Sequence, residues 1–133
     1  MRFAVNPSSV EPVYMQILRQ AREAVARGTL RPGDRLPTVR DLAMELVVNP
    51  NTIAAAYREM ERAGLVHTQR GRGTFVAEMR GPRSATERRR LLQGHVEALL
   101  TEAAHLELSE EEVLEAVRAN ARKYRLKERE SDE

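Results

Sequence analysis

The order of apolar and polar residues predicts a first helix close to the start of the chain. Apolar residues recur three or four positions apart between Val13 and Val25, which is the spacing of one helix face. Pro12 suits the first helical position, where its missing N–H would have no partner anyway, and Gly28 suits the end. We expect a supporting helix here, with its charged residues in solvent.

Two shorter helices are predicted next, separated by a tight turn. Thr38 and Asp41 form a T-x-x-D capping box at the start of one helix. Asn49 is a favourable N-cap and Pro50 a favourable first residue for the other, which ends at Gly64. The second of these helices has an apolar stripe that must face the core, made of Ile53, Ala56, Tyr57 and Met60.

A β-hairpin with a basic tip follows these helices. Residues 65–69 and 74–76 are β-prone, and the segment Gln69-Arg70-Gly71-Arg72-Gly73 separates them. A solubilising loop is the alternative interpretation of this tip. Helix, turn, helix and basic hairpin in this order are typical of a winged helix-turn-helix, which most often places one helix in the major groove of DNA.

The remainder of the chain predicts a helical hairpin. Capping boxes at Ser84 with Glu87 and at Ser109 with Glu112 begin two helices, and apolar residues of the first repeat at alternating spacings of four and three. Two helices alone bury little, so they must pack on a second copy of the chain or on the first domain; self-association is the sharper hypothesis. The predicted dimerisation residues are Leu92, Val96, Leu99, Leu100, Ala103, Leu106, Val113 and Val117.

These elements give an expected fold class that is mainly α with a small β-hairpin wing. A winged helix-turn-helix domain would occupy residues 1–78 and a linker residues 79–83. A helical dimerisation hairpin would occupy residues 84–125, followed by a charged flexible tail at 126–133.

Composition narrows the class of function. Residues 1–80 hold twelve arginines against eight acidic residues, whereas residues 81–133 hold ten basic against twelve acidic residues, so positive charge lies in the predicted DNA-binding part. The absence of cysteine excludes disulfides and cysteine nucleophiles. No apolar run approaches a membrane span and the N-terminus lacks a signal sequence, so we expect a cytoplasmic protein without a membrane partner.

Arg40 is a candidate DNA contact because it lies in the first turn of a helix. A cation there opposes the helix dipole, so another group is expected to stabilise it, either a DNA phosphate or base, or a salt bridge to Asp41 or Glu45. On the face of the following helix opposite the core stripe, the side chains are small or polar, which lets a backbone approach the groove closely. That face comprises Asn51, Thr52, Ala54, Ala55 and Arg58.

Residues 3–77 resemble the N-terminal domain of the GntR family of bacterial transcription regulators. The resemblance rests on Pro12-Val13-Tyr14 with Gln16-Ile17, Pro32-Gly33-Asp34 through Leu36-Pro37, Val39-Arg40-Asp41-Leu42-Ala43, Asn49 to Thr52 with Ala56-Tyr57, and Gly64-Leu65 with Gly71-Arg72-Gly73-Thr74-Phe75-Val76. It implies that Arg40, the helix start at 49–52 and the wing at 70–72 contact operator DNA. Some members carry an arginine where this chain has Ala54, so their base specificity does not transfer.

The short helical appendage resembles that of the YtrA-type subfamily, whose members dimerise through it and often regulate transporter operons. We therefore expect a homodimeric regulator, most simply a repressor, that binds a palindromic operator in double-stranded DNA. The predicted DNA-binding residues are Thr38, Arg40, Asn49, Asn51, Thr52, Arg58, Gln69, Arg70, Gly71 and Arg72.

Other functions fit the sequence less well. A sequence-tolerant architectural DNA-binding protein and a winged-helix adaptor for another protein are the alternatives. The three histidines, His67, His95 and His105, do not form a preformed metal site, and no catalytic constellation is visible, so neither an enzyme nor a metal is expected. No cofactor is expected, and the identity of any small-molecule effector is left open.

Overall fold

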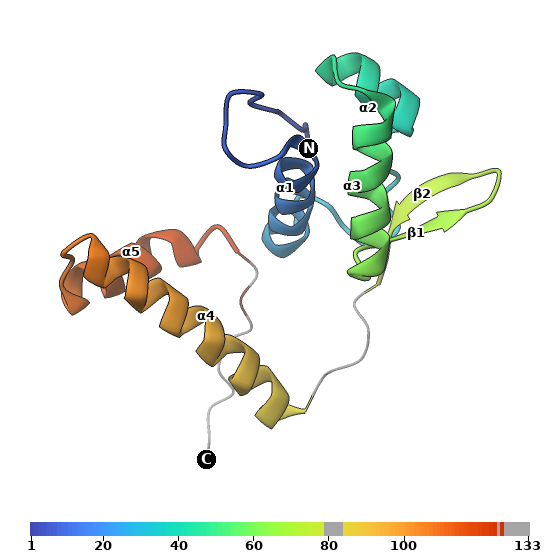
Figure 1. The fold of residues 1–133 in the computed structure, drawn as a ribbon. Coiled ribbons are helices and arrows are strands. Elements are labelled where there is room, and N and C mark those ends of the chain that lie inside the picture. Colours follow the sequence, from blue (N-terminus) through green and yellow to red (C-terminus); the bar gives the residue numbers. More distant parts are fainter. Residues whose placement is uncertain (79–83, 125, 127–133) are drawn as a thin grey trace. The chain divides into compact units, whose positions relative to one another are not determined.

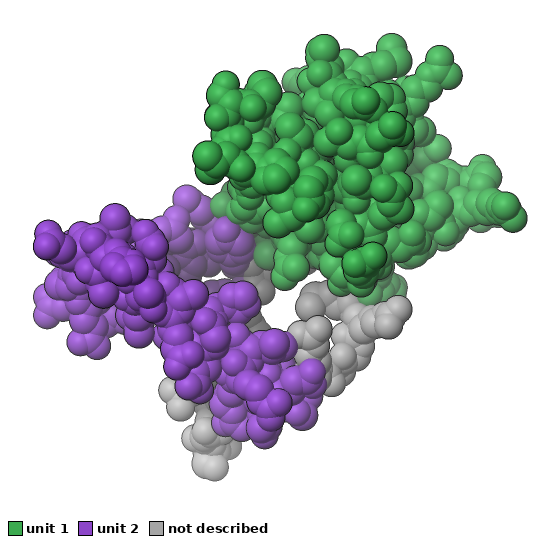
Figure 2. All heavy atoms as spheres, viewed as in Figure 1, with its two compact units in different colours: residues 1–80 green, residues 81–133 purple. Residues whose placement is uncertain are grey.

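The computed structural model describes residues 1–78, 84–124 and 126, and the chain forms two compact units. Unit 1 is Met1–Arg80 and unit 2 is Gly81–Glu133 (Figure 2). The expected linker at 79–83 and almost all of the expected tail lie outside the described residues. Among the described residues, no helix combines the length and the apolar character that crossing a membrane requires.

Unit 1 contains three helices and a hairpin, in the order α1, α2, α3, β1, β2 (Figure 1). The helices are α1 (Val13–Arg27), α2 (Val39–Leu46) and α3 (Pro50–Arg62). The predicted first helical residue of α1 was wrong by one position. Pro12 is the N-cap, with an extended ψ of 149°, and its carbonyl accepts the first hydrogen bonds of the helix from Met15 and Gln16.

The predicted helix caps at the centre of unit 1 are confirmed. Thr38 Oγ1 accepts a hydrogen bond from the Asp41 N–H at 3.0 Å, and Asn49 Oδ1 accepts one from the Asn51 N–H at 2.8 Å. The turn between α2 and α3 includes Val47 in the left-handed region, at φ 55° and ψ 53°. A β-branched residue rarely adopts this conformation, so the tight turn between α2 and α3 carries local backbone strain.

The core of unit 1 forms where α1 and α2 pack on α3, and strand β1 of the hairpin also contacts α3. The predicted stripe of α3 is confirmed, since Ile53, Ala56, Tyr57 and Met60 are all buried. The largest fully buried side chains of the unit are Ile17, Leu42, Ile53, Met60 and Val76. This packing uses one face of α3 and leaves its opposite face available.

The hairpin pairs β1 (Val66–Gln69) with β2 (Gly73–Val76) in antiparallel register, from Val66 opposite Val76 to Gln69 opposite Gly73. Leu65, expected in the first strand, instead donates its N–H to the Met60 carbonyl at 2.9 Å and closes the end of α3. The strand β1 is attached to α3 because the Thr68 N–H donates to Glu61 Oε1 at 3.1 Å.

The segment before α1 is held by side chains of that helix. Gln16 is only 4% exposed, and its amide accepts from the Asn6 N–H at 2.8 Å and donates to the Asn6 and Glu11 carbonyls. Gln20 pairs in the same reciprocal way with the backbone of Ala4. These bonds fix an irregular arm on the domain without a strand or a helix.

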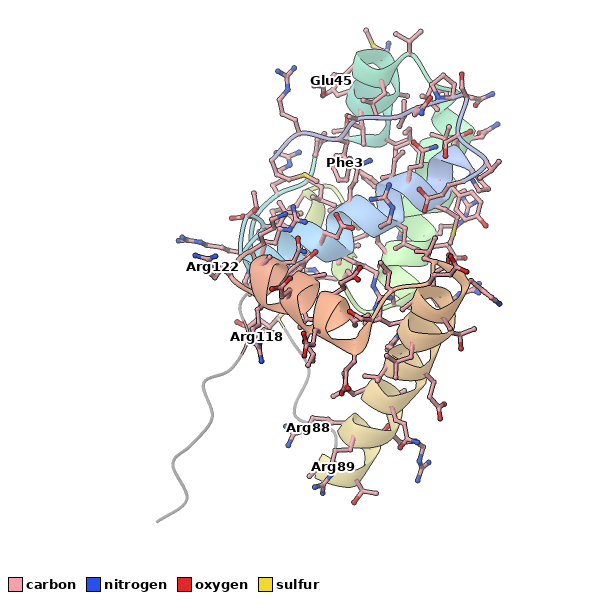
Figure 3. The ribbon with its side chains drawn as sticks, turned by 90° about the vertical axis from the view of Figure 1, so that its left-hand side faces the viewer. Phe3, Glu45, Arg88, Arg89, Arg118 and Arg122 are labelled. Carbon is pink, nitrogen blue, oxygen red and sulfur yellow. The ribbon has the colours of Figure 1, made fainter. Side chains whose placement is uncertain are left out.

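Unit 2 is a hairpin of α4 (Ala85–His105) and α5 (Glu110–Ala121). The predicted caps are confirmed, because Ser84 Oγ and Ser109 Oγ accept from the N–H groups of Glu87 and Glu112, each at 3.1 Å. Leu106, expected within the first of these helices, is the residue that follows it. The side chains of Arg88 and Arg89 extend outward from the start of α4 (Figure 3).

Candidate nucleic-acid interface

Arg40 lies in the first turn of α2 with an exposed, uncompensated guanidinium. Neither Asp41 nor Glu45 forms a salt bridge with it, and no ion pair among the described residues includes it. Glu45 pairs with Arg2 instead, at 3.3 Å. The structure therefore lacks the alternative salt bridge from Arg40 to Asp41 or Glu45. The charge of Arg40 faces solvent beside the positive end of the helix dipole.

The start of α3 presents small and polar groups. Asn49 and Asn51 are exposed, although the side chain of Asn49 is already engaged in capping. Thr52, Ala54 and Ala55 are partly exposed along the same side. No long side chain therefore shields the first turns of this face, and another surface can approach the backbone closely.

Arg58 extends this face by one further turn. It is exposed, and no ion pair among the described residues includes it. Tyr57, its neighbour, belongs to the core instead. Its hydroxyl donates to the Pro37 carbonyl at 2.7 Å, so it is engaged in joining α3 to the segment before α2.

The hairpin projects from the helices of unit 1 (Figure 1), and its tip has two arginines in its sequence. Arg70, Gly71 and Arg72 are exposed and lie between the two strands. The Arg72 N–H donates to the Gln69 carbonyl at 2.9 Å, and Gly71 has φ 79°, a left-handed value that glycine adopts without strain. The turn thus holds two guanidinium groups at the end of a short sheet.

The eight predicted dimerisation residues divide into two groups in unit 2. Ala103 and Val113 are buried, and both side chains line the groove between α4 and α5. The other six are between 40% and 60% exposed. These six, here called the apolar face, are Leu92, Val96, Leu99, Leu100, Leu106 and Val117. Leu99, Leu106 and Val117 also line a groove of about 320 Å³ between the helices.

Comparisons with known proteins agree with this architecture. Residues 13–76 match the family described as bacterial regulatory proteins, gntR family. The chain is 41% identical to the uncharacterized HTH-type transcriptional regulator YhcF of Bacillus subtilis over 110 residues, which is 83% of this chain and 90% of YhcF. It is 47% identical to the HTH-type transcriptional repressor YtrA of the same organism over 74 residues, 56% of this chain and 57% of YtrA.

Solved structures extend the similarity to both units. A transcriptional antiterminator from Listeria monocytogenes aligns with a TM-score of 0.78 and 28% identity over 91% of this chain and 90% of that chain. YtrA from Sulfolobus acidocaldarius, a GntR-family transcription factor, aligns with a TM-score of 0.61 and 31% identity over 74% of this chain and 97% of that chain.

Some of the similar solved structures include DNA. The DNA-binding domain of AraR, in complex with operator ORX1, aligns with a TM-score of 0.50 and 28% identity, over 56% of this chain and 94% of that chain. The family model, the nearly complete match to YhcF and the shared winged helix-turn-helix fold lead to one assignment. This chain belongs to the gntR family of bacterial regulatory proteins.

Proposed function

We propose that the protein is a sequence-specific DNA-binding transcription regulator, a repressor that acts as a homodimer on a palindromic operator. The observation that carries the proposal is the open face of α3 between two sources of unpaired positive charge. Arg40 lies on one side of it in the sequence and the Arg70–Arg72 tip on the other, and none of these arginines has an ion-pair partner among the described residues. Action on bacterial operators implies a cytoplasmic location.

In the proposed complex, α3 enters the major groove by its N-terminal end. Asn51 and Thr52 offer hydrogen-bonding groups to base edges or phosphates, while Ala54 and Ala55 provide methyl groups that suit thymine. Arg58 lies one turn further along and binds a phosphate. Because strong base-reading side chains are few on this face, part of the specificity arises from the shape of the DNA.

Arginines outside α3 supply most of the affinity. Arg40 lies at the start of α2, where a phosphate or a base edge removes its unfavourable interaction with the helix dipole. The Arg70–Arg72 tip lies in the adjoining minor groove, whose negative potential attracts arginine. Thr38, Asn49, Gln69 and Gly71 complete the interface through their backbone or side-chain polar groups, as their positions at the helix starts and wing tip suggest.

Dimerisation through unit 2 explains why the apolar face is exposed in a single chain. Six leucine or valine side chains at 40–60% exposure would favour aggregation of an isolated hairpin, and in the dimer a second copy of the chain covers them. Two-fold symmetry then presents two copies of α3 to half-sites about 34 Å apart, or further if the dimer is wide.

The names of two relatives point to the kind of gene that is regulated. YtrA of Bacillus subtilis is named a repressor, and a relative 40% identical over 70 residues is named the mannosyl-D-glycerate transport/metabolism system repressor MngR of Escherichia coli. Control of a transporter operon is consistent with these names, with repression arising when the bound dimer blocks transcription.

The test of DNA recognition begins by selecting bound fragments from genomic DNA and measuring affinity by gel shift against unrelated DNA. Arg40→Ala is expected to weaken operator binding by about 1–3 kcal/mol if Arg40 reaches a base, which is roughly 5- to 160-fold. Arg22→Ala on α1 removes the same charge from a supporting helix and should bind as wild type does. Equal affinity for selected and unrelated DNA would favour an architectural protein, and no binding even at low salt would favour an adaptor.

Sedimentation velocity tests the dimer. Leu99→Glu places a charge in the centre of the apolar face and should convert the dimer to a monomer. Ala119→Glu, on an exposed position of α5 about 120° around the helix from Val113, is the matched control and should remain dimeric. A monomeric wild-type protein at micromolar concentration would contradict the dimer.

A further inference from the structure

The wing is joined to the segment just before α2, because residues 33–36 pair with β2 through an isolated antiparallel bridge and the hydrogen bonds beside it. The Gly33 N–H donates to the Val76 carbonyl at 2.9 Å, and the Val76 N–H donates back to the Asp34 carbonyl at 2.8 Å. The Leu36 N–H donates to the Thr74 carbonyl at 2.8 Å, and an antiparallel bridge joins Arg35 to Phe75. The base of the wing is therefore fixed by backbone bonds on both sides of β2.

This pairing places Arg35 on the exposed face of the sheet. Residues directly opposite each other in antiparallel pairs share a face, so Arg35, Phe75 and His67 form a row across the bridge and the two strands. The rings of His67 and Phe75 stack with centroids 6.1 Å apart. Leu36, the next residue, is only 3% exposed and points to the opposite face, into the core.

From this row the Arg35 side chain extends toward the tip and lies over Gly73. A Cβ added to Gly73 would stand 2.9 Å from Nε, 3.2 Å from Nη2 and 3.4 Å from Cζ of Arg35. Gly73 also has φ 126°, a conformation that side-chain-bearing residues rarely adopt. The absent side chain at this position is what leaves room for the guanidinium beside the first residue of β2.

The guanidinium of Arg35 forms no ion pair with the described residues of the protein. The adjacent carboxylate of Asp34 instead accepts the Arg31 N–H at 2.9 Å. A guanidinium held on a sheet face by backbone pairing and a glycine is pre-positioned, so little side-chain entropy remains to be lost when an anion binds.

We propose that Arg35 binds a phosphate of the DNA backbone beside the groove that the wing enters. This inference rests on the proposed DNA-binding function and adds a residue outside the predicted DNA-binding set. Arg35 would form, with Arg70 and Arg72, a set of three wing arginines in which two lie at the tip and one lies at the base. The role of Gly73 is to admit the guanidinium, so substitutions at either position should disturb the same contact.

The test is a salt titration of operator binding by fluorescence anisotropy, using the full chain. Each phosphate contact contributes about 0.9 to the slope of log K against log salt, and the proposed homodimer carries two copies of Arg35. Arg35→Gln should therefore lower the slope by about 1.8 and the affinity roughly 30-fold at 0.15 M salt. Arg35→Lys keeps the charge and should keep most of the slope. Arg22→Gln, the charge-matched control on α1, should leave the slope unchanged.

Gly73→Ala provides a second approach to the same contact. It should lower the slope as Arg35→Gln does, and the double variant should show little further loss, because both changes remove one contact. Thermal melts followed by circular dichroism establish that each variant is folded, and Gly73→Ala carries the test should Arg35→Gln not fold.

The outcomes separate this inference from the proposed function. A slope in Arg35→Gln equal to that of wild type would overturn the phosphate contact, even if affinity fell, because a purely structural role changes affinity without removing a counterion. Wild-type binding without any preference for operator, together with a reduced slope in Arg35→Gln, would overturn sequence-specific regulation and leave the phosphate contact supported.

Discussion

Replacing Tyr57 with phenylalanine should destabilise unit 1 at neutral pH and protect it at high pH. Tyr57 lies in α3, is 8% exposed, and donates its hydroxyl hydrogen bond to the Pro37 carbonyl at 2.7 Å. Phenylalanine fills the same space but makes no such bond. Because a net intramolecular hydrogen bond contributes about 1 kcal/mol, we expect Tyr57→Phe to lower the free energy of unfolding by about that amount at pH 7.

The difference reverses in alkali because burial raises the pKa of the Tyr57 hydroxyl above its ordinary value of 10.0. The folded state holds the phenol neutral, whereas the unfolded chain releases the proton once pH exceeds 10. The contribution of this group to stability is therefore complete below pH 10 and is lost as pH rises. At pH 11 ionisation in the unfolded state lowers the stability of the wild type by about 1.4 kcal/mol, which exceeds the value of the hydrogen bond.

The two stability curves should therefore cross between about pH 10.5 and 11. Urea unfolding of the full chain, followed by far-ultraviolet circular dichroism from pH 7 to pH 11, gives the free energies by linear extrapolation. The other titrating groups are common to both proteins and cancel in the comparison. Curves that stay parallel up to pH 11 would refute the buried, neutral hydroxyl, and equal stability at pH 7 would refute the value assigned to its hydrogen bond.

Two further substitutions test the supports of the domain. Gln16→Ala removes three hydrogen bonds from a buried amide and should cost about 3 kcal/mol of unfolding free energy in urea, whereas Gln93→Ala on exposed α4 should cost almost nothing. Val47→Asn should raise the free energy of unfolding by about 1 kcal/mol, because asparagine tolerates the left-handed conformation and Val47 is 90% exposed. Val10→Asn, at an equally exposed site with negative φ, is its control, and a less stable Val47→Asn protein would contradict the strain at this turn.

The helices of unit 1 were predictable because their signals are local. Thr38 and Asn49 act as caps through hydrogen bonds to residues two or three positions ahead, and such bonds depend on little beyond the neighbouring sequence. The core stripe of α3 was equally visible, since one buried face requires a fixed spacing of apolar residues. The exposure of the arginines follows from the fold, whereas their proposed roles depend on a DNA ligand outside the chain.

The pairing of residues 33–36 with β2 and the tethered N-terminal arm were not predictable from local signals. Pro32-Gly33-Asp34 is a turn signal, and a turn is present, with the Asp34 N–H donating to the Arg31 carbonyl at 3.0 Å. Pairing with Val76 begins at the same residues but depends on a segment some forty positions away. Gln16 likewise lay within a recognised motif, yet its bonds to Asn6 and Glu11 require a fold in which that irregular arm doubles back on the helix.

The paired base of the wing allows the sequence of the tip to change without a change in the backbone that positions it. Backbone bonds from residues 33–36 anchor β2, whereas Arg70, Gly71 and Arg72 lie beyond the last strand pair, Gln69 with Gly73. Residues inserted or exchanged in that turn would leave the anchored pairs intact, and a longer loop adds only a small closure entropy. The tip can therefore diverge, or be grafted from a relative to retarget the protein, while the scaffold that aims it stays constant.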